Sequence, residues 1–228
     1  MGFAIVCDPK DKQVNGAADA GVPKAVVSRL SLYLRELQRL VREGQETTSS
    51  TQLGSLFGFT DARVRKDLAY FGQFGYPGIG YRVEELITAI KGILGTDQSW
   101  EVIIVGIGNL GRALLGYKGF ENQGFRIVGA FDSDPAKTDT QIDGVPVYAI
   151  EHMADFVSGR KIRLAIIAVP AVAAQKVADQ LVDAGIDGVV NFAPVTISLP
   201  KSIQLIGVDL AIELEQLSFA VVNQRDNP

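Results

Sequence analysis

Apolar side chains recur at helical spacing near the start of the chain. After Pro23, which suits the first turn of a helix, one apolar stripe consists of Val26, Leu30, Leu34, Leu37 and Val41. Intervals of three and four residues place these side chains on one face of a helix. Gly44 is typical of the position just past a helix end. The pattern predicts an amphipathic helix over residues 23–43.

Two short helices and a hairpin are expected next. Ser49 and Ser50 predict the N-terminus of the first helix and Thr60 that of the second, because hydroxyl side chains accept hydrogen bonds from free amides there. The inward positions of the second helix are Val64, Leu68 and Phe71. Four glycines between residues 72 and 80 exclude a helix and predict a hairpin. Val83–Gly95 shows helical periodicity again.

The pattern changes after Thr96–Trp100, which we expect to form a linker. Short β-branched runs now alternate with helical segments, and these runs are Val102–Val105, Ile127–Phe131, Leu164–Val169 and Val189–Asn191. Such alternation predicts a parallel sheet with helices on both faces. A last helix is expected from near Asp209, and its apolar positions 210, 214, 217 and 221 are too many for a solvated tail.

The whole pattern predicts an α/β chain with two domains. Helix, helix, turn, helix and hairpin is the order of a winged helix-turn-helix, and a Rossmann-like parallel-sheet domain and a C-terminal helix follow it. The expected boundaries are a flexible arm at 1–21, the winged helix at 22–96, the sheet domain at 97–208 and the last helix with its tail at 209–228.

A complete glycine fingerprint follows the first predicted strand of the sheet. Its residues are Gly106, Ile107, Gly108, Asn109, Leu110 and Gly111. In a G-x-G-x-x-G turn the first glycine permits a tight turn, the second lets a pyrophosphate approach the backbone, and the third lets helix and strand pack closely. The next helix offers its N-terminal amides to the phosphates. The segment therefore predicts a dinucleotide-binding site.

An acidic residue stands where the ribose of the dinucleotide is expected. Asp132 ends the second predicted strand, about 20 residues beyond the last glycine. Its carboxylate can accept hydrogen bonds from ribose hydroxyls and would repel a 2′-phosphate, which favours NAD(H) over NADP(H). Asp134 is a nearby alternative for the same role.

Composition and charge narrow the classes of function. The chain has 228 residues, and no apolar run reaches the ~18 residues of a membrane span. The single cysteine, Cys7, excludes an intrachain disulfide, and the N-terminus lacks a secretory pattern, so we expect a cytoplasmic protein. Residues 22–82 carry nine basic and five acidic side chains, a net charge of +4 against −8 for the remainder. This asymmetry favours two domains with different partners.

The residues alone leave other classes open. One is an NAD-dependent oxidoreductase with a helical N-terminal extension, but His152 is the only histidine and a weak candidate for acid–base catalysis. The other is a CoA-binding module, although Asp132 would disfavour the 3′-phosphate of CoA. A Rossmann domain joined to a DNA reader favours instead a metabolite-responsive DNA-binding protein that is not an enzyme.

An ordered set of motifs makes a resemblance to a known family specific. Those in the N-terminal part are Ser28–Leu30, Tyr33–Arg35, Ser49–Gly54, Val64–Leu68, Tyr70–Gly72 and Gly78–Tyr81. Those in the C-terminal part are the glycine fingerprint, Tyr117–Phe120, Phe131–Pro135, Asn191–Pro194 and Leu217–Ala220. With these motifs the chain, from about Val22 to Asn223, resembles the Rex family of redox-sensing transcriptional repressors.

The resemblance implies a homodimer that binds an inverted-repeat operator when apo or bound to NAD+ and releases this double-stranded DNA when NADH binds. It also implies that the C-terminal helix, residues 209–222, is swapped into the partner subunit. Contacts to the cofactor are implied for the fingerprint and the two acids, and also for Val169, Pro170 and Asn191.

The third predicted helix carries the main candidates for DNA contacts. Because Val64 and Leu68 face inward, Arg63, Arg65 and Lys66 point outward, as the faces of a recognition helix require. The resemblance implies that Arg65 and Lys66 make contacts to the major groove and to phosphates, and Arg prefers the guanine edge.

Two more DNA contacts are expected outside that helix, at Ser50 and at Tyr76 in the hairpin. The hairpin departs from the family pattern, because Rex proteins usually carry Lys or Arg where this chain has Tyr76 and Pro77. A wing without a basic tip loses attraction to phosphates, so operator affinity or preference is expected to differ.

A switch between the two ligand states is implied by three residues. Asp209 is expected to pair with Arg35 in the DNA-bound form and to turn to Tyr117 when NADH is bound. Such an exchange would link the nicotinamide pocket to the DNA-binding domain through a two-state element.

Overall fold

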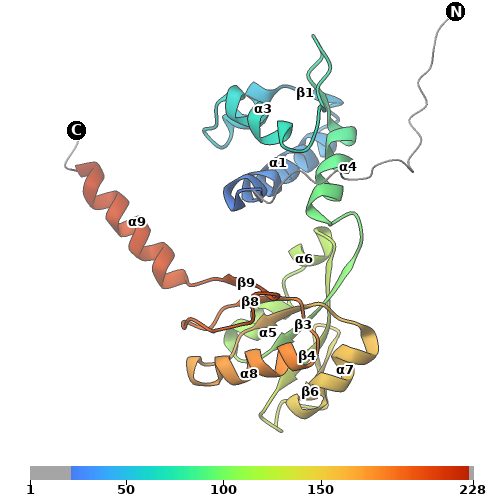
Figure 1. Ribbon diagram of the computed structural model, residues 1–228, viewed down its shortest axis with the longest axis vertical. Coiled ribbons are helices and arrows are strands. Elements are labelled where there is room, and N and C mark those ends of the chain that lie inside the picture. Colours follow the sequence, from blue (N-terminus) through green and yellow to red (C-terminus); the bar gives the residue numbers. More distant parts are fainter. Residues whose placement is uncertain (1–21, 226–228) are drawn as a thin grey trace, which may run out of the picture. The chain divides into compact units, whose positions relative to one another are not determined.

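The computed structural model describes residues 22–225, so the arm predicted at residues 1–21 lies outside the described residues. The chain divides into two compact units, and the boundary falls between Leu94 and Gly95 (Figure 1). Each unit has a hydrophobic core of its own.

The first unit is built from four helices and a small sheet within residues 22–94. The helices are α1 (Lys24–Arg42), α2 (Ser50–Ser55), α3 (Asp61–Ala69) and α4 (Val83–Leu94). The sheet pairs β1 (Thr47–Thr48) with β2 (Tyr81–Arg82) in antiparallel fashion. The sequence pattern did not predict this sheet, because two-residue strands carry no detectable periodicity.

The predicted helix starts are confirmed with one correction. The Ser49 hydroxyl accepts a hydrogen bond from the Gln52 amide at 3.0 Å, and the Thr60 hydroxyl accepts one from the Arg63 amide at 3.2 Å. Ser49 is thus the N-cap of α2, and Ser50 is the first residue of that helix.

The apolar stripe predicted for α1 lies in the core of the first unit, except at its last position. Leu30, Leu34 and Leu37 are buried as expected, but Val41 is 40% exposed, so its predicted place in the core is wrong. Leu40 is buried instead. It lies three residues after Leu37, and this interval keeps both side chains on the face of α1 that packs against the core.

The second unit contains a seven-stranded sheet within residues 95–225. Its strands are β3 (Trp100–Val105), β4 (Phe125–Asp132), β5 (Thr140–Ile142), β6 (Val145–Ala149), β7 (Leu164–Ile167), β8 (Gly188–Asn191) and β9 (Gln204–Gly207). Their order is β5-β6-β4-β3-β7-β8-β9, and all pairs are parallel except β5 with β6. The predicted parallel sheet is confirmed, while β5, β6 and β9 were not predicted.

Several strand boundaries differ from the prediction by one or two residues. Trp100 already belongs to β3 and not to the linker, and β7 ends at Ile167, two residues before the predicted end. The helices of this unit are α5 (Asn109–Leu115), α6 (Gly119–Asn122), the 3₁₀ turn η1 (Ile150–His152), α7 (Met153–Arg160), α8 (Ala171–Asp183) and α9 (Leu210–Arg225).

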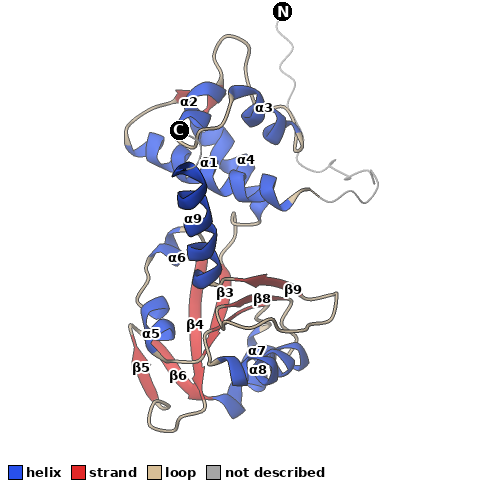
Figure 2. Cartoon of the chain, turned by 90° about the vertical axis from the view of Figure 1, so that its left-hand side faces the viewer, coloured by secondary structure: helices blue, strands red, loops and turns tan. Residues whose placement is uncertain are grey.

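Helices cover both faces of the sheet (Figure 2). Residues Ile103 and Val105 of β3 face a core shared with α7 and α8, while Val102 and Ile104 face a second core that includes α5. This alternation follows from the two-residue period of a strand. The chain leaves β3 toward β4 and leaves the neighbouring β7 toward β8, in opposite directions along the sheet. Open α/β sheets bind ligands at such a point.

The apolar side chains of α9 are not buried against any part of the chain that the structure describes. Every side chain from Leu210 to Asn223 is exposed, including Phe219 at 71%. The apolar positions expected to dock, at 210, 214, 217 and 221, are all among the exposed residues.

Candidate functional site

The glycine turn after β3 has two crowded glycines and one open glycine. Gly106 has a φ of +98°, and a Cβ there would lie 2.6 Å from the Ala168 carbonyl oxygen. A Cβ on Gly111 would lie 2.0 Å from the Gly106 carbonyl oxygen. Around Gly108, in contrast, a Cβ would meet nothing within 4 Å. The first and third glycines are therefore required by the packing of the chain itself.

The open position is the one that a pyrophosphate would approach. Gly108, Asn109 and Leu110 are exposed where α5 begins, while Ile107 is buried beneath them. A side chain at Gly108 would fill the space next to the first amides of α5, which are the groups that bind phosphates in this motif. The residues present thus fit a dinucleotide.

Asp132 is tied to the glycine turn by hydrogen bonds. Its Oδ2 accepts from the Ile107 amide at 2.7 Å and from Lys137 Nζ at 3.2 Å, and its Oδ1 accepts from the Asp134 amide at 2.9 Å. Asp132 is only 7% exposed. The predicted ribose acid therefore also fixes the turn that would hold the pyrophosphate.

The carboxyl of Asp132 remains an anion in spite of its burial. Burial alone would raise its pKa, but the amides of Asp134 and Ile107 and the ammonium of Lys137 hold that pKa below the ordinary value. Lys137 is a residue that sequence reasoning missed. The only local signal was a basic side chain five positions after the acid.

Asp134 lies at the rim of this cluster. Its Oδ1 accepts from the Ala136 amide at 3.0 Å, and its Oδ2 lies 3.7 Å from Lys137 Nζ. Asp132 is the more buried and better connected of the two acids, whereas the Asp134 side chain is 47% exposed, so both remain candidates for the ribose contact.

The remaining cofactor candidates lie at the carboxyl ends of β7 and β8. Val169 and Pro170 connect β7 to α8 and lie beside the turn, because a Cβ on Gly106 would come within 2.7 Å of Val169 Cγ1. The side-chain amide of Asn191 donates to the carbonyls of Ala193 and Val195 at 3.2 and 2.9 Å. Asn191 therefore braces its own loop and lines the cavity described below for Asp209.

The expected recognition helix divides its faces as predicted. Val64 and Leu68 are buried, and Arg63, Arg65 and Lys66 are exposed. In α3 the guanidinium of Arg65 donates to Asp61 Oδ2 at 2.7 Å and to Ser50 Oγ at 3.2 Å.

Three of the predicted DNA contacts line one cavity. It has a volume of about 520 Å³, and Ser50, Arg65 and Tyr76 are among the residues around it. Arg63 and Lys66 are not among the residues that line this cavity. The structure thus brings the wing, α2 and part of α3 together around one concave surface.

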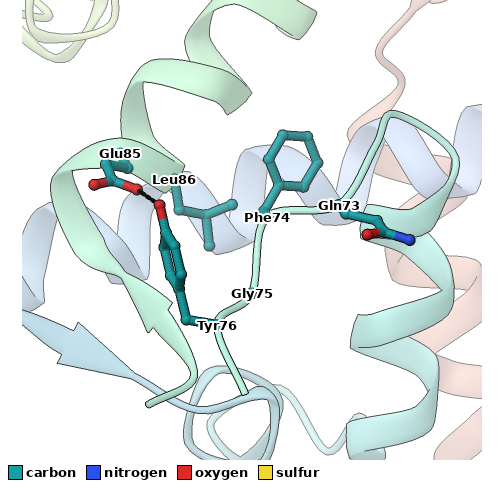
Figure 3. A pocket seen from close by; sticks show the side chains of 6 residues that line it. All are labelled: Gln73, Phe74, Gly75, Tyr76, Glu85 and Leu86. Atoms are coloured by element: carbon teal, nitrogen blue, oxygen red, sulfur yellow. Dashed lines mark hydrogen bonds between the residues drawn. The ribbon is translucent and has the colours of Figure 1, made fainter. Parts of the chain in front are cut away.

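The wing is held in place by its own tyrosine. Tyr76 donates from its hydroxyl to Glu85 Oε2 at 2.9 Å (Figure 3). Its backbone amide donates to the Gly80 carbonyl at 2.7 Å. Arg82 lies over the Tyr76 ring at 5.1 Å and donates to Glu85 Oε1 at 3.1 Å. The hydrogen bond to Glu85 raises the pKa of Tyr76. Tyr76 therefore orders the wing as well as facing solvent.

One of the three switch candidates belongs to the first unit and two belong to the second. Arg35 is exposed on α1 in the first unit. In the second unit Tyr117 is 59% exposed with its ring edge-on to Phe120 at 5.0 Å. Asp209 accepts a hydrogen bond from the Ala211 amide at 2.9 Å and lines a cavity of about 580 Å³ at the base of α9.

Two further findings limit the kinds of site within residues 22–225. None of the described helices has the length and hydropathy that crossing a membrane requires. Among these same residues, no group of His, Cys, Asp and Glu side chains is arranged to hold a metal ion.

Comparisons with known proteins agree with both parts of the site. The family model described as CoA binding domain matches residues 97–195, and the one described as putative DNA-binding protein N-terminus matches residues 21–69. The redox-sensing transcriptional repressor Rex of Pelotomaculum thermopropionicum is 46% identical over 203 residues, which are 89% of this chain and 95% of that relative.

Solved structures show the same similarity. The structure of RSP, a Rex-family repressor, in complex with β-NAD+ and operator DNA has a TM-score of 0.85 and 37% identity, covering 91% of this chain and 95% of that one. The structure of RSP with β-NADH has a TM-score of 0.81 and 36% identity, covering 91% and 97%. This chain therefore belongs to the Rex family of redox-sensing transcriptional repressors.

Proposed function

We propose that this chain is a transcriptional repressor that senses the ratio of NADH to NAD+. It binds an inverted-repeat operator when apo or bound to NAD+ and releases that operator when NADH binds. One observation carries the proposal: the chain combines two features. The first is a glycine turn with open space at Gly108 and a hydrogen bond to Asp132, and the second is a helix that exposes Arg65 and Lys66.

The cofactor is proposed to lie along the fingerprint, with its adenosine ribose at Asp132 and Asp134 and its nicotinamide toward Val169, Pro170 and Asn191. NADH and NAD+ differ by one charge at the nicotinamide ring, so a sensor needs groups near that ring whose contacts differ between the two states. Supporting this placement, the crevice at the carboxyl ends of β3 and β7 is where the connections diverge.

The proposed switch uses Asp209, Arg35 and Tyr117. An aspartate that pairs with an arginine in one state and with a tyrosine hydroxyl in the other can shift affinity 5- to 150-fold with about 1–3 kcal/mol of coupling. We expect Asp209→Ala to keep its NADH affinity and to lose most of the NADH-driven release of DNA. Release as in the wild type by this variant would remove the switch.

The proposed assembly is a homodimer in which α9, together with the tail of residues 209–228, docks on the partner subunit. Each large apolar side chain that becomes fully buried contributes about 1.5–3 kcal/mol, and α9 exposes Leu214, Leu217 and Phe219 among others. The other proposed domains are a DNA-binding domain at residues 22–96 and a cofactor domain at 97–208.

DNA contacts are proposed for Arg63, Arg65 and Lys66, with Ser50 and Tyr76 at the wing side. Lys66→Ala should lower operator affinity and leave NADH affinity unchanged, since the two sites lie in different units. Lys24→Ala is a matched control, because it removes the same charge from an exposed position of the same unit. Equal operator affinity in both variants would contradict the assignment of Lys66.

The test of the whole proposal is selection of genomic DNA fragments by the protein. Fragments retained with NAD+ and lost with NADH would support it and would give the operator, while retention under neither condition would contradict it. The proposal includes a cytoplasmic location and no catalysis. Steady turnover of a substrate with NAD+ would instead favour an oxidoreductase, and tight binding of CoA would favour the activity suggested by the CoA binding domain model.

A further inference from the structure

A buried carboxylate connects the recognition helix to α1. Asp67 of α3 is 1% exposed and accepts two hydrogen bonds from the guanidinium of Arg29, from Nε to Oδ2 at 2.5 Å and from Nη2 to Oδ1 at 2.8 Å. The hydroxyl of the buried Tyr33 donates to Oδ2 at 2.9 Å. Arg29 also lies 5.9 Å from the ring centre of Phe59. We call Arg29, Tyr33 and Asp67 the α1–α3 clamp.

The α1–α3 clamp keeps a charge in the core of the first unit. Burial alone would raise the pKa of Asp67, but the hydrogen bonds from Arg29 and Tyr33 hold that pKa below its ordinary value. Buried ion pairs contribute little net stability, and apolar replacements of similar volume are often neutral or stabilising. Stability alone therefore does not explain why these residues stand here.

Orientation offers a better explanation. The apolar anchors of α3 are Val64 and Leu68, and apolar packing has no preferred direction. A bidentate guanidinium–carboxylate pair fixes both distance and orientation. Asp67 follows Arg65 and Lys66 directly in the sequence, so the rotation of α3 that the clamp sets is also the rotation that directs those two side chains outward.

We propose that Asp67, held by Arg29 and Tyr33, is the positioning residue that fixes the rotation of α3 against α1 and thereby sets the register of Arg65 and Lys66 on DNA. This inference rests on the proposed function for its DNA readout. Contacts to phosphates place a protein on the duplex and base contacts specify the sequence, so an unclamped helix loses specific binding before it loses general attraction to DNA.

A second ion pair on α1 supplies a matched control. Arg39 donates to Glu36 through Nε at 3.0 Å and Nη2 at 2.6 Å, and the Glu36 side chain is 4% exposed. This pair is also bidentate and also has a buried carboxylate, but both of its residues lie on α1. It does not reach the recognition helix.

The experiment compares two charge-neutral double replacements. Arg29→Met with Asp67→Leu removes the clamp, and Arg39→Met with Glu36→Leu removes the control pair, so neither variant changes the net charge that attracts DNA. The full-length variants are measured for thermal unfolding, for affinity to operator and to unrelated DNA with NAD+, and for amide hydrogen exchange in residues 61–69. Tyr33→Phe, which removes one hydroxyl, is measured in the same way.

The clamp variant should lose at least about tenfold in the ratio of operator to unrelated-DNA affinity, and its α3 amides should exchange faster. The control variant should keep both values. An unchanged ratio in the clamp variant would overturn the proposal, whatever its amide exchange, as would equal losses in both variants. A purely structural role would lower the unfolding temperature without changing the ratio.

The proposal can still be tested if the clamp variant does not fold or if the wild type does not bind DNA. Should the clamp variant fail to fold, faster α3 exchange in Tyr33→Phe supports the clamp, and exchange like that of the wild type overturns it. Should the wild type bind no DNA, the proposed function fails, while the exchange comparison between the clamp and control variants still supports or overturns the positioning of α3.

Discussion

The tripeptide Gly-Ile-Gly occurs both in the wing and in the fingerprint, at Gly78–Gly80 and Gly106–Gly108. Ile79 is 54% exposed, whereas Ile107 is fully buried. The crowded glycine is also at opposite ends: a Cβ on the last glycine of the wing would lie 2.4 Å from the Thr48 carbonyl oxygen, and in the fingerprint the first glycine is the crowded one. Identical residues thus serve two different surfaces.

The preceding residues explain the difference. Ile107 follows a buried strand, and its amide donates to Asp132, so its side chain enters the core. Ile79 follows a tight turn in which its amide donates to the Tyr76 carbonyl at 3.1 Å, so its side chain remains in solvent. In each loop one glycine, Gly78 or Gly108, has open space where a Cβ would stand. The structural role of a glycine motif therefore depends on the element that precedes it.

The largest expected effect comes from adding a methyl group at the crowded glycine of the fingerprint. Gly106→Ala should destabilise the second unit by about 3–5 kcal/mol, because a left-handed φ is unfavourable for alanine and its Cβ would overlap the Ala168 backbone. Gly78→Ala, with a φ of +77° but no neighbour within 4 Å, should cost only about 1 kcal/mol. Chemical denaturation of both variants checks this, and similar losses would refute the difference in crowding.

The next largest effect is the difference in unfolding free energy between alanine replacements of Ile107 and Ile79. Ile107→Ala removes a buried side chain and should cost about 2–4 kcal/mol. Ile79→Ala removes an exposed one and should change the free energy of unfolding by less than about 0.5 kcal/mol. The same denaturation series measures both. A costly Ile79→Ala would mean that the wing is packed against the protein and is not free to meet DNA.

A smaller effect is expected at the open glycine of the fingerprint. Gly108→Ala should leave the unfolding temperature unchanged, since a Cβ there meets nothing within 4 Å. It should lower NADH affinity about tenfold, or about 1.4 kcal/mol, because the methyl group would occupy the space of the pyrophosphate. Calorimetric titration with NADH tests this, and unchanged affinity would place the pyrophosphate elsewhere.

An effect of similar size, which disappears at low pH, is expected at Asp132, whose carboxylate accepts a hydrogen bond from the Ile107 amide. Because the folded-state pKa of Asp132 is lowered, its ionised form stabilises the fold above the unfolded pKa of about 4, and this contribution is lost as the pH falls below that value. The difference in unfolding free energy between the wild type and Asp132→Asn should be about 1–2 kcal/mol near pH 7. It should shrink below about pH 4. A difference that is independent of pH would contradict an ionised Asp132.

The parts of the fold that the sequence predicted are those with continuous local patterns. The strands β3, β4, β7 and β8 are short β-branched runs, and the fingerprint is contiguous, so periodicity and spacing were sufficient. The strands β5, β6 and β9, at or next to the edges of the sheet, were missed, because their three to five residues mix polar, apolar and proline positions.

The site was predictable only as far as its residues are close in sequence. Asp132 was found from its distance to the fingerprint, but its contact with Lys137 and its hydrogen bond from Ile107 depend on the fold. The Arg29–Asp67 pair spans 38 positions between two helices, and no local pattern indicates it. Tertiary pairing of this kind is visible only once the helices are packed.

The bidentate pair between Arg29 and Asp67 also constrains how this chain can change over evolutionary time. Loss of one partner would strand a buried charge at a cost of about 3–5 kcal/mol, while loss of both can be nearly neutral for stability. Single substitutions at either position should therefore be removed by selection, and replacements should occur in pairs. Among relatives of this chain, Arg29 and Asp67 are expected to be retained together or replaced together, as spatially paired positions are.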